Sequence, residues 1–135
     1  MDIQRVRAII IKDGKVLLMH RIKSGLEYWA FPGGGIEESD KSPEDGLKRE
    51  CLEELGVEVE VKELFMNRSS IAPHRLGHME SFYICNIVKG VVGTGTGPEF
   101  TRDVEIHGSY EVEWLSLSEI KNKNVWPIEV RDKIV

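Results

Sequence analysis

The chain has 135 residues, a length that fits one compact domain over residues 1–135, able to bury about two-thirds of its unfolded surface. Apolar residues make up 41% of the sequence and the formal net charge is −5, which disfavours both a disordered chain and a basic protein that binds a nucleic-acid polymer. No apolar run approaches the roughly 20 residues that span a bilayer, and the first residues lack the apolar core of a secretory signal. We therefore expect a cytoplasmic protein without a membrane partner.

The composition also bears on the kind of ligand. The average field of an acidic protein repels a phosphorylated substrate unless cations mediate the encounter, which points to bound metal. The two cysteines, Cys51 and Cys85, are too few and too scattered for a disulfide scaffold or a thiolate metal site. We expect both to be buried packing residues.

The N-terminal part of the chain predicts a β-hairpin followed by a short strand. Residues 5–12 and 15–21 are apolar and β-branched, and Asp13-Gly14 between them is a two-residue turn signal. Residues 28–31 form an aromatic strand that stops at Pro32. The glycines at 33–35 permit backbone angles and close approaches that side chains would block, so a loop is expected to begin there.

Residues 42–55 carry the signals of a capped helix. Ser42 suits the N-cap, Pro43 suits the first helical position, and Asp45 completes a capping box. Gly56 is expected to end the helix in the left-handed conformation. The apolar residues that recur every four positions, and so define the buried face, are Leu47, Cys51 and Leu55.

The rest of the chain is dominated by strands. Alternating or apolar patterns predict strands at residues 57–65, 79–88 and 110–117. Ser118 is expected to cap a short helix, and residues 127–135 are expected to form a terminal helix. The glycine-rich segment 90–98 is expected to be a connector. Because the helices interrupt the strands without regular alternation, we predict an α+β domain.

Glutamates converge on one face of the predicted helix. Glu50, Glu53 and Glu54 fall at i, i+3 and i+4, where like charges cost roughly a few tenths of a kcal/mol per pair. A divalent cation such as Mg²⁺, which prefers oxygen ligands, would offset that repulsion. The alternative is a solvated acidic face on which Lys48 and Arg49 form surface salt bridges.

The order of these features resembles the signature of the Nudix hydrolases (MutT-like). In that family a glycine turn and an acidic loop precede Arg-Glu-apolar-x-Glu-Glu-x-Gly-apolar, and residues 49–57 match every defined position of this helix half. Residues 29–35, Trp-Ala-Phe-Pro-Gly-Gly-Gly, are also typical of the family. The resemblance implies an α/β/α sandwich around a mixed β-sheet, with a loop-helix-loop metal site.

The loop half of the signature departs from the family pattern. Asp40 stands where the family has glutamate, and one additional residue separates it from Arg49. We interpret this as a one-residue insertion, with Asp40 in the place of the glutamate that pairs with the signature arginine. The metal carboxylates are unaffected by the insertion, so activity is expected to survive.

The resemblance implies a magnesium-dependent attack of water on a diphosphate linkage, with Mn²⁺ able to substitute. Glu50, Glu53 and Glu54, with the carbonyl of Gly33, are the implied metal ligands, and Glu53 or Glu50 orients or deprotonates the water beside Arg49. Further carboxylates can come from a later strand, where Glu111 and Glu113 are candidates or solvent-facing residues. The implied substrate-binding residues are Arg21, Phe31, Gly34 and Glu111, with a surface arginine as the alternative for Arg21 and a core residue as the alternative for Phe31.

Several features leave the substrate open. Glu129 aligns loosely with an asparagine that reads the base in the branch acting on oxidised guanine nucleotides, so ordinary or oxidised nucleoside triphosphates and ADP-ribose all remain candidates. Tyr28 or Trp126 could stack on a base. The four histidines, His20, His74, His78 and His107, share no metal-ligand spacing.

Other functions remain open alongside the enzyme. The altered loop around Asp40 fits a non-catalytic nucleotide-binding sensor domain on the same fold, and an acidic helix alone fits a plain interaction domain. Related proteins are often homodimers, which makes a homodimer a further expectation.

Overall fold

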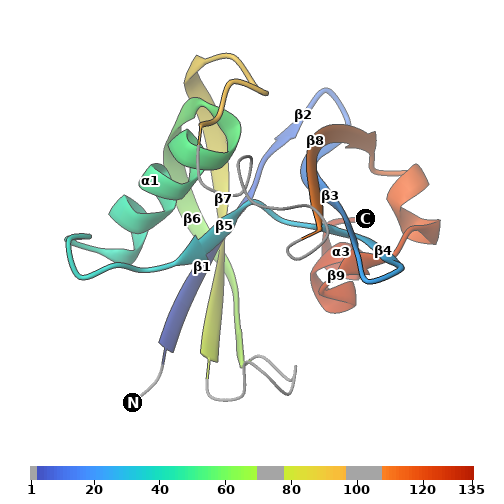
Figure 1. Ribbon diagram of the computed structural model, residues 1–135, viewed down its shortest axis with the longest axis horizontal. Helices are drawn as coiled ribbons and strands as arrows, with labels where there is room; N and C mark the ends of the chain where they lie inside the picture. Colours follow the sequence, from blue (N-terminus) through green and yellow to red (C-terminus); the bar gives the residue numbers. More distant parts are fainter. Residues whose placement is uncertain (1–2, 70–77, 97–107) are drawn as a thin grey trace.

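The computed structural model describes residues 3–69, 78–96 and 108–135, which form two sheets with helices on opposite sides of the molecule (Figure 1). The first sheet contains, in spatial order, β5 (Gly33–Gly35), β1 (Ile3–Ile9), β7 (His78–Gly90) and β6 (Val57–Ser69). The second contains β2 (Ile11–Lys12), β3 (Lys15–Lys23), β4 (Leu26–Ala30) and β9 (Val125–Trp126), and β8 (Ser109–Ser116) pairs with β3. The mixed α+β fold is confirmed.

The hairpin expected at the N-terminus is only partly present. β1 pairs parallel with β7 and antiparallel with β5, and only Ile11 and Lys12 of β2 pair with β3. The turn at Asp13-Gly14 does form, with positive φ at both residues. The reason for the difference is that β1 lies between two partners inside the first sheet, so only the segment beyond Ile10 can pair with the second sheet.

The predicted helix is α1 (Pro43–Leu55). The hydroxyl of Ser42 accepts a hydrogen bond from the backbone N–H of Asp45 at 3.1 Å, and Gly56 adopts φ 76° and donates to the carbonyl of Leu52. The residues of the predicted stripe, Leu47, Cys51 and Leu55, are fully buried against the first sheet. The local signals therefore fixed both ends and the buried face of this helix.

The three glycines form a strand rather than the start of a loop. β5 pairs antiparallel with β1, and a Cβ on Gly33 would lie 1.9 Å from the carbonyl oxygen of Val6. Only glycine allows the two backbones this approach, and its φ of 144° is unfavourable for other residues. The loop begins instead at Ile36.

The C-terminal part covers a second core. β8 is followed by the 3-10 helix η3 (Glu119–Asn122) and by α3 (Ile128–Ile134). Ser118 does not cap η3 with its side chain, contrary to expectation, because Ser116 accepts the hydrogen bond from Glu119 instead. Buried residues of this core include Trp29, Phe31, Phe82, Leu115 and Ile120.

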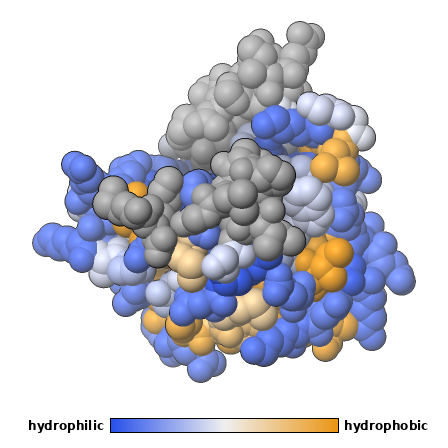
Figure 2. Space-filling model, turned by 90° about the horizontal axis from the view of Figure 1, so that it is seen from below, coloured by the Kyte–Doolittle hydropathy of each residue, from blue (hydrophilic) through white to orange (hydrophobic). Residues whose placement is uncertain are grey.

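Among the described residues, no helix has the length and apolar character needed to cross a membrane. On the face seen in Figure 2, hydrophobic side chains form separate patches among hydrophilic ones. Both cysteines are buried and unpaired, as expected, and burial raises the pKa of the Cys85 thiol to about 12.

Candidate active site

The glutamates of α1 lie in unequal environments. The side chain of Glu53 is 38% exposed and that of Glu50 13%, whereas Glu54 is 5% exposed as a residue. Oε1 of Glu54 accepts a hydrogen bond from the backbone N–H of Gly33 at 2.9 Å. Because a buried carboxylate needs partners, this bond joins α1 directly to β5.

Glu50 lies against the next glycine. A Cβ built on Gly34 would lie 2.7 Å from Oε1 of Glu50 and within 2.9 Å of its other carboxylate atoms. The absence of a side chain at Gly34 thus leaves the space that the Glu50 carboxylate occupies. Glu50 also accepts a hydrogen bond from Nη1 of Arg49 at 3.1 Å, and Glu53 accepts one from the same atom at 3.3 Å.

Arg49 is held by the loop that precedes the helix. Its Nε and Nη2 donate to the two carboxylate oxygens of Asp40, both at 3.0 Å, and Nη2 also donates to the carbonyl of Gly35 at 3.1 Å. These hydrogen bonds from Arg49 lower the pKa of Asp40 below its usual value. Despite the insertion, Asp40 therefore braces Arg49 as the expected glutamate would.

The inserted loop fits because the helix leaves room for it. A Cβ on Gly46 of α1 would lie 2.9 Å from Oδ2 of Asp40. The same oxygen accepts a hydrogen bond from the backbone N–H of Glu37 at 2.8 Å, and the carboxylate of Glu37 lies 3.4 Å from Arg49. The shorter aspartate side chain is thus compensated by a close approach of loop and helix.

A cleft of about 220 Å³ is lined by both carboxylates and arginines. Glu50, Glu54 and the glycines of β5 line one part of it, and Arg5, Arg7 and Arg21 another. Arg21 is held in place because Nε donates to the carbonyl of Ser109 and the guanidinium lies 3.6 Å from the ring centre of Tyr110. The cleft thus combines a carboxylate side suited to a cation with a basic side suited to phosphate groups.

A model of the NUDIX domain family matches residues 2–133 of this chain. The chain belongs to the Nudix family. Like the relatives that are named hydrolases and pyrophosphohydrolases, it is a hydrolase acting on acid anhydrides. Helix α1 (Pro43–Leu55) is the helix of the Nudix signature and is called the Nudix helix below.

Several similar proteins and solved structures match this chain over most of its length. A protein of Escherichia coli (strain K12) named CTP pyrophosphohydrolase is 30% identical over 132 residues, which is 95% of this chain and 86% of that protein. The solution structure of the E. coli ORF135 protein is 27% identical, with a TM-score of 0.66 over 96% of this chain and 85% of its own. A MutT Nudix hydrolase of Burkholderia pseudomallei shares the fold, with a TM-score of 0.75 at 19% identity over 100% of this chain and 98% of its own.

Three of the predicted site residues in this Nudix chain do not line the cleft. Arg49 and Glu53 lie beside it, joined to Glu50 through the Arg49 guanidinium, whereas Glu111 lies on another face. It faces His20 across β3 and β8, on the opposite side of the sheet from Arg21 and Tyr110. Side chains alternate along a strand, so the neighbouring Tyr110 lines the cleft in its place. Phe31 lines the cleft too, but its ring packs edge-on against Phe82 in the second core.

The residues around Glu111 form a separate cluster. His20, Glu111 and Glu113 offer ligand atoms within 4.8 Å of one another. Nδ1 of His20 contacts Glu113 at 2.5 Å and Nε2 contacts Glu27 at 2.8 Å. Burial opposes a charged imidazole, but these two carboxylates outweigh it, and the pKa of His20 is raised. His20 is thus hydrogen-bonded; His74 and His107 lie outside the described residues.

The aromatic candidates for base stacking contact each other. The rings of Tyr28 and Trp126 stack with centroids 4.8 Å apart, and the hydroxyl of Tyr28 accepts a hydrogen bond from Arg21 at 3.1 Å. Trp126 is nevertheless an exposed residue.

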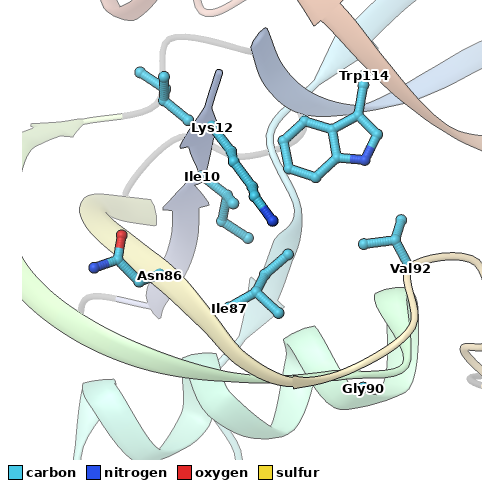
Figure 3. A pocket seen from close by; sticks show the side chains of 8 residues that line it. Ile10, Lys12, Asn86, Ile87, Gly90, Val92 and Trp114 are labelled. Carbon is cyan, nitrogen blue, oxygen red and sulfur yellow. The ribbon is translucent and has the colours of Figure 1, made fainter. Parts of the chain in front are cut away.

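A second cavity, of about 440 Å³, is less suited to phosphate chemistry (Figure 3). Ile10, Ile87, Val92 and Trp114 supply apolar walls, and Lys12 extends towards the space between Ile87 and Trp114. Carboxylates do not contribute to its lining among the described residues. The smaller cleft with Glu50 and Glu54 is therefore the candidate active site.

Arg5 and Arg7 were missed by the sequence reading. Arg7 lines the cleft and donates through Nη1 to the carbonyls of Phe31 at 3.1 Å and Gly33 at 3.3 Å. The signal that could have revealed them is the period of two: Arg5 and Arg7 are alternate residues of β1, and so share one face of the strand.

The residues of the Nudix helix fit a hard divalent cation in their chemistry. Glu50 and Glu54 present carboxylate oxygens at the cleft, and Gly33 and Gly34 present backbone without side chains beside them. Glu53 is turned towards Arg49, and Glu54 is bonded to Gly33, so these side chains are held by protein partners.

Proposed function

We propose that this Nudix hydrolase cleaves a pyrophosphate linkage in a nucleotide or nucleoside diphosphate derivative with the help of Mg²⁺, for which Mn²⁺ can substitute. The observation that carries the proposal is the cleft lined by the carboxylates of Glu50 and Glu54 together with the arginine side chains of Arg5 and Arg21. Carboxylates can hold the cation, and arginines can contact the phosphate oxygens of the diphosphate bound to it.

The proposed roles follow from the contacts of each side chain. Glu50, Glu53, Glu54 and the carbonyl of Gly33 would hold the metal, which supplies charge neutralisation on the phosphate oxygens. Arg49, anchored by Asp40, keeps Glu50 and Glu53 in position. Arg21, with its guanidinium fixed by Tyr110 and Ser109, would bind a phosphate group.

Glu53 or Glu50 would orient or deprotonate the attacking water. Both carboxylates accept a hydrogen bond from Arg49, which fixes their direction. Glu53 has the greater exposure and therefore the easier access to water. Glu54, which is committed to the Gly33 amide, is better suited to holding the metal than to moving a proton.

The proposed substrates are nucleoside triphosphates and nucleoside diphosphate derivatives. The relative named CTP pyrophosphohydrolase supports CTP as the first compound to test, followed by ordinary and oxidised purine triphosphates and ADP-ribose. The experiment is to incubate each compound with the protein in Mg²⁺, in Mn²⁺ and in EDTA, and to separate the nucleotide products by anion-exchange chromatography.

Matched variants test the assigned residues. Glu53→Gln and Glu50→Gln should lower kcat by at least about 100-fold if either carboxylate handles the water or metal. Glu58→Gln, which changes an exposed glutamate of β6, should leave kcat unchanged. Activity of Glu53→Gln and Glu50→Gln equal to that of Glu58→Gln would contradict the proposal, and nucleotide binding without turnover would favour a sensor domain instead.

A further inference from the structure

A line of alternating charges runs from the cleft across the first sheet to α3. Nε of Arg7 lies 3.6 Å from Oε2 of Glu80, and Oε1 of Glu80 accepts a hydrogen bond from Arg68 at 3.0 Å. Nε of Arg68 in turn donates to Glu129 at 2.8 Å. The line thus crosses β1, β7 and β6 and ends on the C-terminal helix.

Most of this line is shielded from water. Glu80 is buried, and the side chains of Arg7 and Arg68 are only 14% and 13% exposed. Removing charges from water is unfavourable, and a buried ion pair offsets this loss only with good geometry. Three charged groups placed at one end of a sheet, where apolar residues would serve stability equally well, indicate a role beyond stability.

At its cleft end the line contacts the backbone beside the Nudix helix. Nη1 of Arg7 donates to the carbonyls of Phe31 and Gly33, the residues on either side of Pro32. The N–H of Gly33 donates to Glu54. The backbone of Gly33 is therefore held at its amide by a carboxylate of the Nudix helix and at its carbonyl by Arg7.

We propose that Arg7 is a positioning residue that fixes the Phe31–Gly33 turn against Glu54, and that Glu80 holds the Arg7 guanidinium in the orientation this requires. This inference rests on the proposed function, in which Gly33 and Glu54 contribute to the metal site. Groups that orient metal ligands typically contribute 10–100-fold to metal affinity or activity. The carbonyl oxygen of Gly33 has two lone pairs, so the bond from Arg7 leaves one lone pair for another partner.

A positioning role and a substrate-binding role make different predictions for Arg7. Since Nη1 and Nε face protein groups, loss of the guanidinium should misplace the turn while leaving the other basic side chains to bind the phosphates. In the positioning role, loss of the guanidinium should therefore lower kcat while KM stays nearly constant. Direct substrate binding would raise KM instead.

The test compares Arg7→Met with Arg7→Lys, Glu80→Gln and the control Arg131→Met. Arg131 is matched because it is 18% exposed and also donates to a backbone carbonyl, that of Lys123, away from the cleft. For each protein, kcat and KM are measured, and the rise of Tm with Mg²⁺ concentration is measured without substrate. The second readout reports metal affinity independently of turnover, since a ligand that binds only the folded state raises Tm.

For Arg7→Met we expect kcat to fall at least 10-fold while KM stays within about 2-fold of the parent value. The Mg²⁺ midpoint, which is the Mg²⁺ concentration that gives half of the rise in Tm, should increase about 10-fold. Arg7→Lys should recover part of both effects because an ammonium group can still donate to a carbonyl, and Glu80→Gln should reproduce them in part. Arg131→Met should lower Tm alone.

The proposal is overturned if Arg7→Met matches Arg131→Met in kcat and in Mg²⁺ midpoint, or if KM rises with kcat unchanged. Wild-type values for Glu80→Gln would overturn the part assigned to Glu80. If Arg7→Met does not fold, the same criteria apply to Arg7→Lys and Glu80→Gln. Failure of the proposed function is distinguishable, because the parent protein would then show neither turnover nor an Mg²⁺-dependent rise of Tm.

Discussion

Substitution of Gly34 by alanine should separate the activity of this protein from its stability. The new Cβ would lie 2.7 Å from Oε1 of Glu50, so the carboxylate must retreat by about 0.7 Å to reach the 3.4 Å at which ordinary contact begins. An off-rotamer glutamate costs roughly 0.5–1.5 kcal/mol. Replacing glycine by alanine lowers the entropy of the unfolded chain and stabilises by roughly 0.4–1 kcal/mol.

These contributions to the free energy of unfolding nearly cancel, so Tm of Gly34→Ala should stay within about 3 °C of the parent. Activity should respond much more strongly, because a misplacement of about 1 Å in a catalytic group can cost on the order of 100-fold. We expect kcat to fall roughly 10- to 100-fold.

The neighbouring glycine provides the control. A Cβ on Gly35 would have Nη1 of Arg5, 4.0 Å away, as its nearest neighbour, so Gly35→Ala leaves Glu50 undisturbed. Steady-state kinetics on the best nucleotide substrate and thermal unfolding are compared for the two variants. If Gly34→Ala is as active as Gly35→Ala, the position of the Glu50 carboxylate does not matter to the reaction and the reasoning fails.

The remaining predictions concern the loop, the core and the histidine cluster. Asp40→Asn should destabilise by about 2 kcal/mol at neutral pH by weakening its charge-assisted bonds to Arg49, measured by urea unfolding. The folded-state pKa of Asp40 is lowered, so its carboxylate stabilises the fold above the unfolded-state pKa of about 3.9, and this stabilisation is lost as pH falls through the folded-state pKa. Equal free energies of unfolding for the parent and Asp40→Asn at neutral pH would contradict this. Leu47→Ala, in the buried stripe of α1, should cost roughly 2–5 kcal/mol, whereas Leu52→Ala, on the exposed face, should cost under about 0.5 kcal/mol; equal losses in chemical denaturation would mean the stripe is misassigned. Glu113→Gln should lower the raised pKa of His20, seen in an NMR titration of the imidazole protons, and an unchanged pKa would show that Glu27 alone supports the charge.

The parts of the fold that local chemistry determines could be predicted from the sequence. The cap at Ser42, the stripe that includes Leu47 and the terminator Gly56 all act within a few residues, and α1 has the predicted bounds. The strand at residues 57–65 was predicted too short, because its extension to Ser69 depends on pairing with β7, which the pattern of polar residues after Phe65 does not report.

The site was predictable where it lies on the helix and less so elsewhere. The spacing of Glu50, Glu53 and Glu54 depends only on helical geometry. The role of Arg7 depends on register with Gly33 across β1 and β5, which no local pattern reports. Glu111 and Tyr110 alternate as a strand requires, but the sequence did not reveal which side of β8 faces the cleft.

The passage of one extended segment between the two sheets has a consequence for how the protein unfolds. Ala8 and Ile10 are buried in one core and Ile9 in the other, so neighbouring residues anchor both halves. Neither half can lose its structure without pulling an anchoring residue out of the other. The slowest-exchanging backbone amides of β3 and of β7 should therefore give the same free energy of opening, because the two sheets do not open independently.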